Sequence, residues 1–139
     1  MFLLDTNVIS ELRKARSGKC DRRVENWAAG IPAASQFTSA IVILELEMGV
    51  LQIEHRDPAQ GKVLRKWLDE YVGPAFTERV LAVDTIAARR CAKLLVTAPR
   101  SDRDALIAAT ALVHSLTVVT RNTSDFDATG VPTLNPWRL

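Results

Sequence analysis

The sequence predicts an α/β fold: a three-layer arrangement in which a central, mainly parallel sheet of four to five short strands is flanked by helices. Two observations lead to this prediction. Short apolar segments alternate along the chain with longer amphipathic ones, as in repeated strand–helix units. The short segments are also apolar throughout, which is typical of strands that are buried on both faces of a parallel sheet. No repeat, linker or low-complexity stretch interrupts the pattern, so we expect one domain over residues 1–139.

Four segments are predicted strands because they are apolar or rich in β-branched residues, and because turn residues or a helix start bound them. In chain order they cover residues 2–4, 35–39, 80–83 and 116–120, and one more short apolar piece follows at 132–134.

Six segments between these strands are predicted helices because their apolar residues recur every three to four positions. They cover residues 6–14, 21–29, 40–54, 59–71, 85–96 and 102–114. Helix-breaking sequences follow the first four of them and support these ends: Ser17-Gly18, Gly30-Ile31-Pro32, Asp57-Pro58 and Gly73-Pro74.

Composition narrows the class of protein. The chain is 47% hydrophobic and 24% charged, which is enough apolar material for a substantial core. No apolar run approaches the roughly 20 residues that span a bilayer, and no basic segment precedes an apolar one at the N-terminus. Cys20 and Cys91 are the only cysteines and have no metal-binding spacing. We therefore expect a cytoplasmic protein without a membrane partner.

The net charge is only +2, but the basic residues are grouped. One group is compact and a second is looser: Arg13, Lys14, Arg16, Lys19, Arg22 and Arg23, and then Arg89, Arg90, Lys93, Arg100 and Arg103. Such groups are either solvated surface or the contact surface for a polyanion.

Asp5 follows the first predicted strand directly and is followed by Thr6 and Asn7. An aspartate here is a good cap for the helix that begins at residue 6. A catalytic role is compatible with that, because ligands of open α/β sheets gather at the carboxyl ends of the strands.

Asp125 lies in the segment TRNTSDF, after the fourth predicted strand. The local sequence explains an aspartate at position 125 as part of a turn, because asparagine, serine and aspartate all favour turns. Thr120 and Asn122 precede it, however, so this strand also ends in polar residues. Two polar strand ends in a parallel sheet can face the same crevice.

Glu45 lies within the apolar surface of the helix predicted over residues 40–54. On a helical wheel it falls nearly opposite Glu47 and Glu54, which we expect to mark the solvent face, and beside Leu44 and Met48. A buried carboxylate requires a cation or hydrogen-bond donors. The alternative is a partly exposed or salt-bridged glutamate.

Asp104 is explained locally by the capping-box pattern Ser101-Asp102-Arg103-Asp104. The small residues Ala108 and Ala111 share its helix face, however, so this face can approach another element closely and carry Asp104 inward. Asp102 points elsewhere and is expected to face solvent.

These acids together favour a metal site. Asp5, Glu45, Asp104 and Asp125 are expected at one edge of the sheet, where several carboxylates repel one another unless a cation is present. Ligands that are all oxygen suit Mg²⁺ or Mn²⁺, which can activate a water molecule against a phosphodiester. No histidine and cysteine cluster indicates zinc, and no glycine-rich phosphate loop is present.

The chain resembles the PIN-domain ribonucleases, in particular the VapC-like toxins of bacterial toxin–antitoxin pairs and the FitB-type proteins. The resemblance rests on five stretches: LLDTNVIS at 3–10, SAIVILELEMG at 39–49, DALIAATAL at 104–112, TVVTRNTSDF at 117–126 and NPW at 135–137. It implies a PIN-like sandwich and endoribonuclease activity that depends on Mg²⁺ or Mn²⁺. It also implies inhibition by a cognate antitoxin, and a homodimer or a higher assembly with that antitoxin.

By motif position, the resemblance also implies roles for single residues. Asp5, Glu45 and Asp104 match the metal-binding acids of the family, and Asp125 matches its more variable fourth acid. The supporting polar positions are Thr6, Asn7, Thr120 and Asn122.

Two other functions remain open from the sequence. A PIN-like module that binds RNA or protein without turnover has no need to keep four repelling acids. A phosphohydrolase with Asp5 as covalent nucleophile normally has a second aspartate two positions later, where this chain has Asn7.

Overall fold

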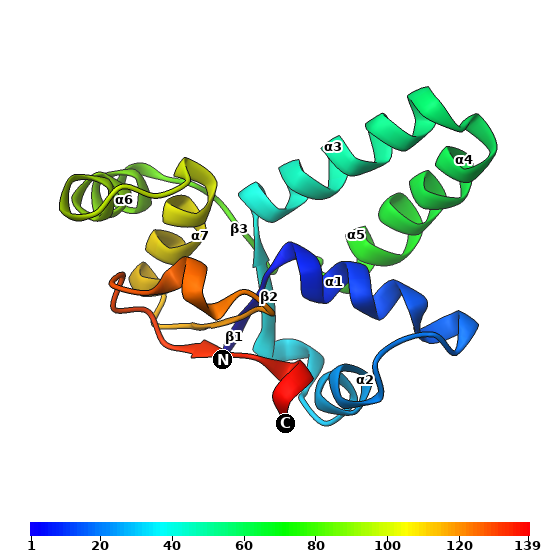
Figure 1. The fold of residues 1–139 in the computed structure, drawn as a ribbon, viewed down its shortest axis with the longest axis horizontal. Helices are drawn as coiled ribbons and strands as arrows, with labels where there is room; N and C mark the ends of the chain where they lie inside the picture. Colours follow the sequence, from blue (N-terminus) through cyan, green and yellow to red (C-terminus); the bar gives the residue numbers. More distant parts are fainter.

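A five-stranded parallel sheet forms the centre of the molecule, in a computed structural model that describes residues 1–139 (Figure 1). The strand order is β3-β2-β1-β4-β5, and every neighbouring pair is parallel. The strands are β1 (Phe2–Leu4), β2 (Gln36–Ser39), β3 (Val80–Leu81), β4 (Thr117–Val119) and β5 (Thr133–Leu134). The predicted α/β class and the parallel sheet are confirmed.

Helices flank the sheet. They are α1 (Thr6–Leu12), which continues as the 3₁₀ helix η1 (Arg13–Ser17), α2 (Arg22–Ala29), α3 (Ala40–Arg56), α4 (Pro58–Trp67), α5 (Gly73–Ala75), α6 (Thr85–Thr97) and α7 (Asp102–Val113). Figure 1 shows α6 and α7 at one end of the molecule and the α3–α4 hairpin at the other. No helix is long and apolar enough to cross a membrane.

The central strands are buried on both faces, as their apolar sequences predict. Leu3 and Leu4 of β1 and Val118 and Val119 of β4 have no exposed surface. Leu3 lies opposite Val118 in the register. The backbone N–H of Asp5 extends this pairing and donates to the carbonyl of Val119 at 3.0 Å. The end of β1 is therefore held firmly against β4.

The solvent face that we predicted for α3 is only partly exposed, because the Glu47 and Glu54 side chains keep 41% and 34% of their surface open to solvent. Glu47 and Glu54 face α4, where both accept hydrogen bonds from Arg65 at 2.5–3.2 Å. A helical wheel shows which residues share a face, but it does not show that a following helix will cover that face.

The apolar surface of α3 also differs from the prediction. Val42, Leu46 and Val50 pack into the core, whereas Leu44 and Met48 beside Glu45 are 44% and 41% exposed. Because α3 is apolar on most of its circumference, the periodicity does not select which apolar side meets the sheet.

Gly73-Pro74 does not end the fourth predicted helix. A wide turn, Leu68–Val72, follows α4, and the N–H of Gly73 donates to the carbonyl of Leu68. Pro74 then lies at the start of α5, where a proline needs no backbone donor. The widened turn thus accommodates a residue that normally breaks a helix.

Candidate functional site

Asp5 is the buried centre of the candidate site. It follows β1, caps α1 and is 7% exposed. Its Oδ1 accepts from the N–H of Thr6 at 2.8 Å, and its Oδ2 accepts from the Thr120 hydroxyl at 2.9 Å. Burial raises the pKa of Asp5 above its usual value, although these two hydrogen bonds oppose that shift. The capping role and the position at the strand end thus coexist.

Thr120 and Asn7 connect the ends of β1 and β4. Thr120 is completely buried, and its hydroxyl oxygen accepts from the Asn7 side-chain amide at 3.2 Å. The same oxygen accepts from the N–H of Asn122 at 3.1 Å. The Asn7 side-chain oxygen accepts from the N–H of Arg121 at 3.1 Å. These contacts fix both the orientation of Asp5 and the path of the chain after β4.

Glu45 approaches the same region from α3. Its Oε1 accepts from the Thr6 hydroxyl at 2.7 Å, and its Oε2 lies 3.5 Å from Nη1 of Arg103 on α7. The Glu45 side chain is 24% exposed. Both sequence interpretations therefore describe part of the result: the carboxylate faces the site, and it is also salt-bridged.

Asp104 lies in the first turn of α7, where its N–H lies 3.4 Å from the capping hydroxyl of Ser101. Its pKa is raised to about 6, chiefly by loss of solvent and then by the negative charges of Asp125, Asp5 and Glu45. The nearby Arg103 opposes the shift. Asp104 is therefore close enough to the other three acids to respond to their charge.

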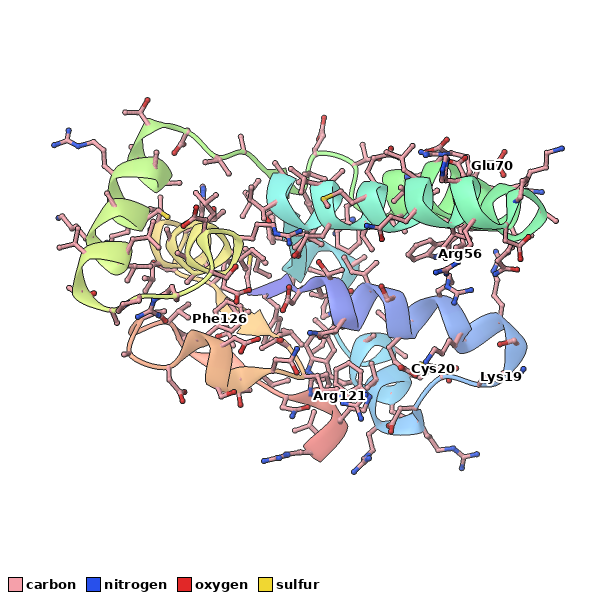
Figure 2. All side chains as sticks on the ribbon, turned by 45° about the horizontal axis from the view of Figure 1, so that its top comes forward. Lys19, Cys20, Arg56, Glu70, Arg121 and Phe126 are labelled. Atoms are coloured by element: carbon pink, nitrogen blue, oxygen red, sulfur yellow. The ribbon has the colours of Figure 1, made fainter.

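Asp125 is exposed and lies in a 3₁₀ turn, Thr123–Phe126, after β4. Its N–H donates to the Asn122 carbonyl at 3.1 Å, as in the predicted turn. Phe126, labelled in Figure 2, is 2% exposed and anchors this turn in the core. The Asn122 side chain is exposed and makes no hydrogen bond, so only its backbone joins the network.

The four acids come from four separate elements and converge at the carboxyl edge of the sheet. The charges of Glu45 and Asp125 both raise the pKa of Asp5, as the charge of Asp5 does for Asp104. In the arrangement seen here, however, no three histidine, cysteine, aspartate or glutamate side chains lie close enough together to hold one ion.

The chemistry of the donors nevertheless fits a hard divalent cation. The side chains that converge here offer carboxylate, hydroxyl and amide oxygens and no sulfur or imidazole, a set that suits Mg²⁺ or Mn²⁺. Burial and mutual repulsion make Asp5 and Asp104 poor anions on their own. A cation would relieve both penalties.

Sequence reasoning missed two contacts at this edge. The first is Arg103, which we grouped only with the second basic cluster, although its position before Asp104 brings it to Glu45. The second is Asn135, whose side-chain amide donates to the Arg121 carbonyl at 3.3 Å. The Arg121 guanidinium in turn lies 5.1 Å from the centre of the Trp137 ring. Figure 2 labels Arg121.

The chain is similar to known proteins over most of its length. The family model described as "PIN domain" matches residues 2–131. "VapC ribonuclease Y4jK" of Sinorhizobium fredii is 39% identical over 144 residues, covering 99% of this chain and 98% of that protein. "Toxin FitB" of Neisseria gonorrhoeae is 36% identical over 142 residues, covering 99% of each.

Solved structures show the same fold. The crystal structure of FitAcB from Neisseria gonorrhoeae superposes with a TM-score of 0.89 at 36% identity, covering 100% of both chains. The structure of FitAB bound to an IR36 DNA fragment gives a TM-score of 0.87 at 34% identity, covering 100% of this chain and 97% of the other.

Proposed function

The chain belongs to the PIN-domain family, and on that premise we propose that it is a metal-dependent endoribonuclease that acts as a toxin and is neutralised by a cognate antitoxin. The observation that carries the proposal is the convergence of four acids at one edge of the sheet, two of them with raised pKa values. Relatives named as a VapC ribonuclease and as a toxin support the choice of activity.

In this proposal Asp5, Glu45 and Asp104 hold Mg²⁺ or Mn²⁺, and Asp125 completes the acidic set. The bound cation supplies an activated water and stabilises charge on the phosphodiester. Thr120 holds Asp5 in place through its 2.9 Å hydrogen bond. Thr6 holds Glu45 at 2.7 Å, so the two carboxylates bind with little loss of side-chain freedom.

The test is RNA cleavage by the purified chain. We expect single-stranded RNA to be cut in Mg²⁺ or Mn²⁺, to remain intact in excess EDTA, and to be cut again when the metal is restored. Cleavage that continues unchanged in EDTA would overturn the metal-dependent part of the proposal. RNA that stays intact under all metal conditions would overturn the nuclease.

A cognate antitoxin is the proposed partner, because the FitAcB and FitAB structures, which this chain matches over its whole length, are toxin–antitoxin complexes. We expect a small protein encoded next to this chain to co-purify with it and to suppress both RNA cleavage and growth inhibition.

We also propose that residues 1–139 are one PIN domain that forms a homodimer. Sedimentation of the purified chain will measure its oligomeric state.

One observation favours a second candidate, a module that binds RNA or protein without turnover. Arg103 pairs with Glu45, and no three of the acids lie close enough together in this arrangement to hold one ion. Calorimetry separates the two candidates, because the enzyme binds Mn²⁺ at millimolar concentration and the module does not.

A further inference from the structure

A groove leaves the acid site and runs along α1 and η1, opposite α3 and α4. Its first cavity, of about 260 Å³, has walls from α1, α3 and α4 and begins beside Thr6 and Glu45. A second cavity, of about 350 Å³, continues past η1 to Tyr71. Arg13 and Trp67 line both cavities, so the two are adjoining parts of one groove. Side chains from both sides point into the space between α1 and the α3–α4 hairpin (Figure 2).

The groove wall that α1 supplies is a single helix face. Thr6, Ser10 and Arg13 are spaced four and three positions apart, which places them above one another. Arg13 lies about 10 Å along the helix from Thr6. The face therefore changes from hydrogen-bonding groups beside the acids to cationic groups farther out.

Two arginines in the groove lie within cation–π distance of aromatic rings. The guanidinium carbon of Arg16 lies 3.7 Å from the centre of the Tyr71 ring, and that of Arg13 lies 5.9 Å from the centre of the Trp67 ring. Tyr71 is 39% exposed and Trp67 is partly exposed, so both rings border the open groove. Each guanidinium is thereby attracted to the electron-rich face of its ring.

Neither of these arginines has a carboxylate partner or a side-chain hydrogen bond, in contrast to Lys14 and Arg23 of the same basic group. Lys14 pairs with Glu11 at 3.1 Å, and Arg23 pairs with Asp21 at 3.2 Å. A guanidinium that makes no hydrogen bond or ion pair within the chain has its N–H groups available for the oxygens of a phosphate. Arg13 and Arg16 are thus oriented, cationic and unneutralised.

We propose that this groove binds the single-stranded RNA that flanks the scissile bond, with Arg13 and Arg16 on its phosphates and Trp67 and Tyr71 against its bases. The inference rests on the proposed nuclease function, because an internal cut requires the strand to continue beyond the acids. Single-strand binding sites combine a cationic groove with aromatic stacking surfaces, and this groove contains both.

The test is the affinity of the whole chain for a short, fluorescein-labelled single-stranded RNA, measured by anisotropy in EDTA so that no cleavage occurs. We expect Arg13→Ala and Arg16→Ala each to weaken binding about three- to tenfold. Each should also lower the slope of log affinity against log salt by about 0.7. Tyr71→Leu should weaken binding about fivefold and leave the salt slope unchanged.

The matched control is Arg89→Ala on α6, at the opposite end of the molecule (Figure 1), which removes the same charge and should leave the affinity unchanged. Equal losses in Arg89→Ala and Arg16→Ala would overturn the groove assignment, because charge alone would then explain binding. Unchanged RNA affinity in Arg13→Ala and Arg16→Ala would overturn the groove assignment as well. This includes the case in which these variants no longer bind the antitoxin but still bind RNA normally. Cleavage in Mg²⁺ is scored separately, so a failed groove and a failed nuclease give different results.

Discussion

Asp5 combines two roles, helix cap and buried acid. As a cap it accepts the N–H of Thr6, and as a buried acid it lies within reach of the charges of Glu45 and Asp125. The hydrogen bonds from Thr6 and Thr120 keep a desolvated carboxylate in one orientation. The cap therefore helps to prepare the acid for a cation.

Replacing Asp5 by asparagine should separate these roles. We expect Asp5→Asn to reduce metal-dependent RNA cleavage by at least about a hundredfold, because an amide is a weak ligand for a hard cation. Stability should change by less than about 1 kcal/mol, because relief of the buried charge offsets the lost acceptor for Thr120. Cleavage rates and urea unfolding in EDTA measure the two effects.

The control for this variant is Asp127→Asn, an exposed aspartate just beyond the 3₁₀ turn that carries Asp125. It should cleave RNA at the wild-type rate. A cleavage rate for Asp5→Asn close to that of Asp127→Asn would contradict the role assigned to Asp5.

Asp104 should make the stability of the metal-free chain depend on pH. Its pKa is about 6 in the folded chain and near 3.8 in the unfolded one, so the folded chain holds this proton more tightly between these values. Its contribution to stability is therefore complete below about pH 4 and is lost as the pH rises through 6. Because the group is partly exposed, we expect a loss of about 1 kcal/mol.

Urea unfolding between pH 4 and 7 in EDTA measures this effect, with Asp104→Asn as the comparison. The variant should lack this component of the decline, although Asp5, whose pKa is also raised, contributes a decline of its own in both proteins. Parallel pH profiles for wild type and Asp104→Asn would show that Asp104 does not carry the proton.

At the scale of residues, the sequence predicted the acids but not all of their partners. Asp5, Thr120 and Asn7 do meet, because each follows the end of a strand in a parallel sheet. The ion pair of Arg103 with Glu45 was not predictable, since it joins two helices whose relative rotation no periodicity records. The same limitation explains why the contact of Glu47 with Arg65 was not predicted.

Among the elements, α3 and α4 depend on one close approach. A Cβ at Gly61 would lie 2.4 Å from the Cα of Glu54 and 2.8 Å from its backbone nitrogen. Backbone atoms cannot rotate out of the way as a side chain can, so the two helices would have to separate. Arg65, which bridges the same helices, would then lose its fit to Glu54.

We therefore expect Gly61→Ala to destabilise the chain by about 2 kcal/mol, despite the better helix propensity of alanine. Gly49→Ala in α3 is the matched change, because a Cβ there meets nothing within 4 Å. It should stabilise the chain by about 0.5 kcal/mol. Urea unfolding of both variants measures the difference, and equal effects would show that the approach at Gly61 is not tight.

Element boundaries were largely predictable because capping residues mark them. Asp5, Ser39, Asp84 and Ser101 each accept from a backbone N–H in the first turn of the helix that follows. The turn at Gly73-Pro74 was not predictable, because the wide turn before it depends on the packing of Leu68 and Val72 in the core.

For the whole molecule, strand order explains where the site lies. In chain order, β1, β2 and β3 are added to the sheet on one side of β1. The chain then crosses over, and β4 and β5 are added on the other side of β1. The order therefore reverses between β1 and β4, and ligands of such sheets bind at that point. Asp5 and Thr120 leave these two strands and hydrogen-bond to each other there. Alternation of strands and helices predicted the parallel sheet, whereas this order became known only from the structure.

The same convergence predicts how a cation should act on the whole chain. Folding brings four acids together, so the metal-free fold bears repulsion that Mg²⁺ or Mn²⁺ binding would remove. Because only the folded chain assembles the acids, metal at ten to a hundred times its dissociation constant should add about 1 to 3 kcal/mol of stability.

Thermal unfolding measures this effect. Added metal should raise the unfolding temperature by several degrees in wild type and by much less in Asp5→Asn and Asp104→Asn. Potassium chloride at equal ionic strength controls for screening of the acids. A rise of the same size in potassium chloride, or in Asp5→Asn, would mean that the acids repel one another without forming a metal site.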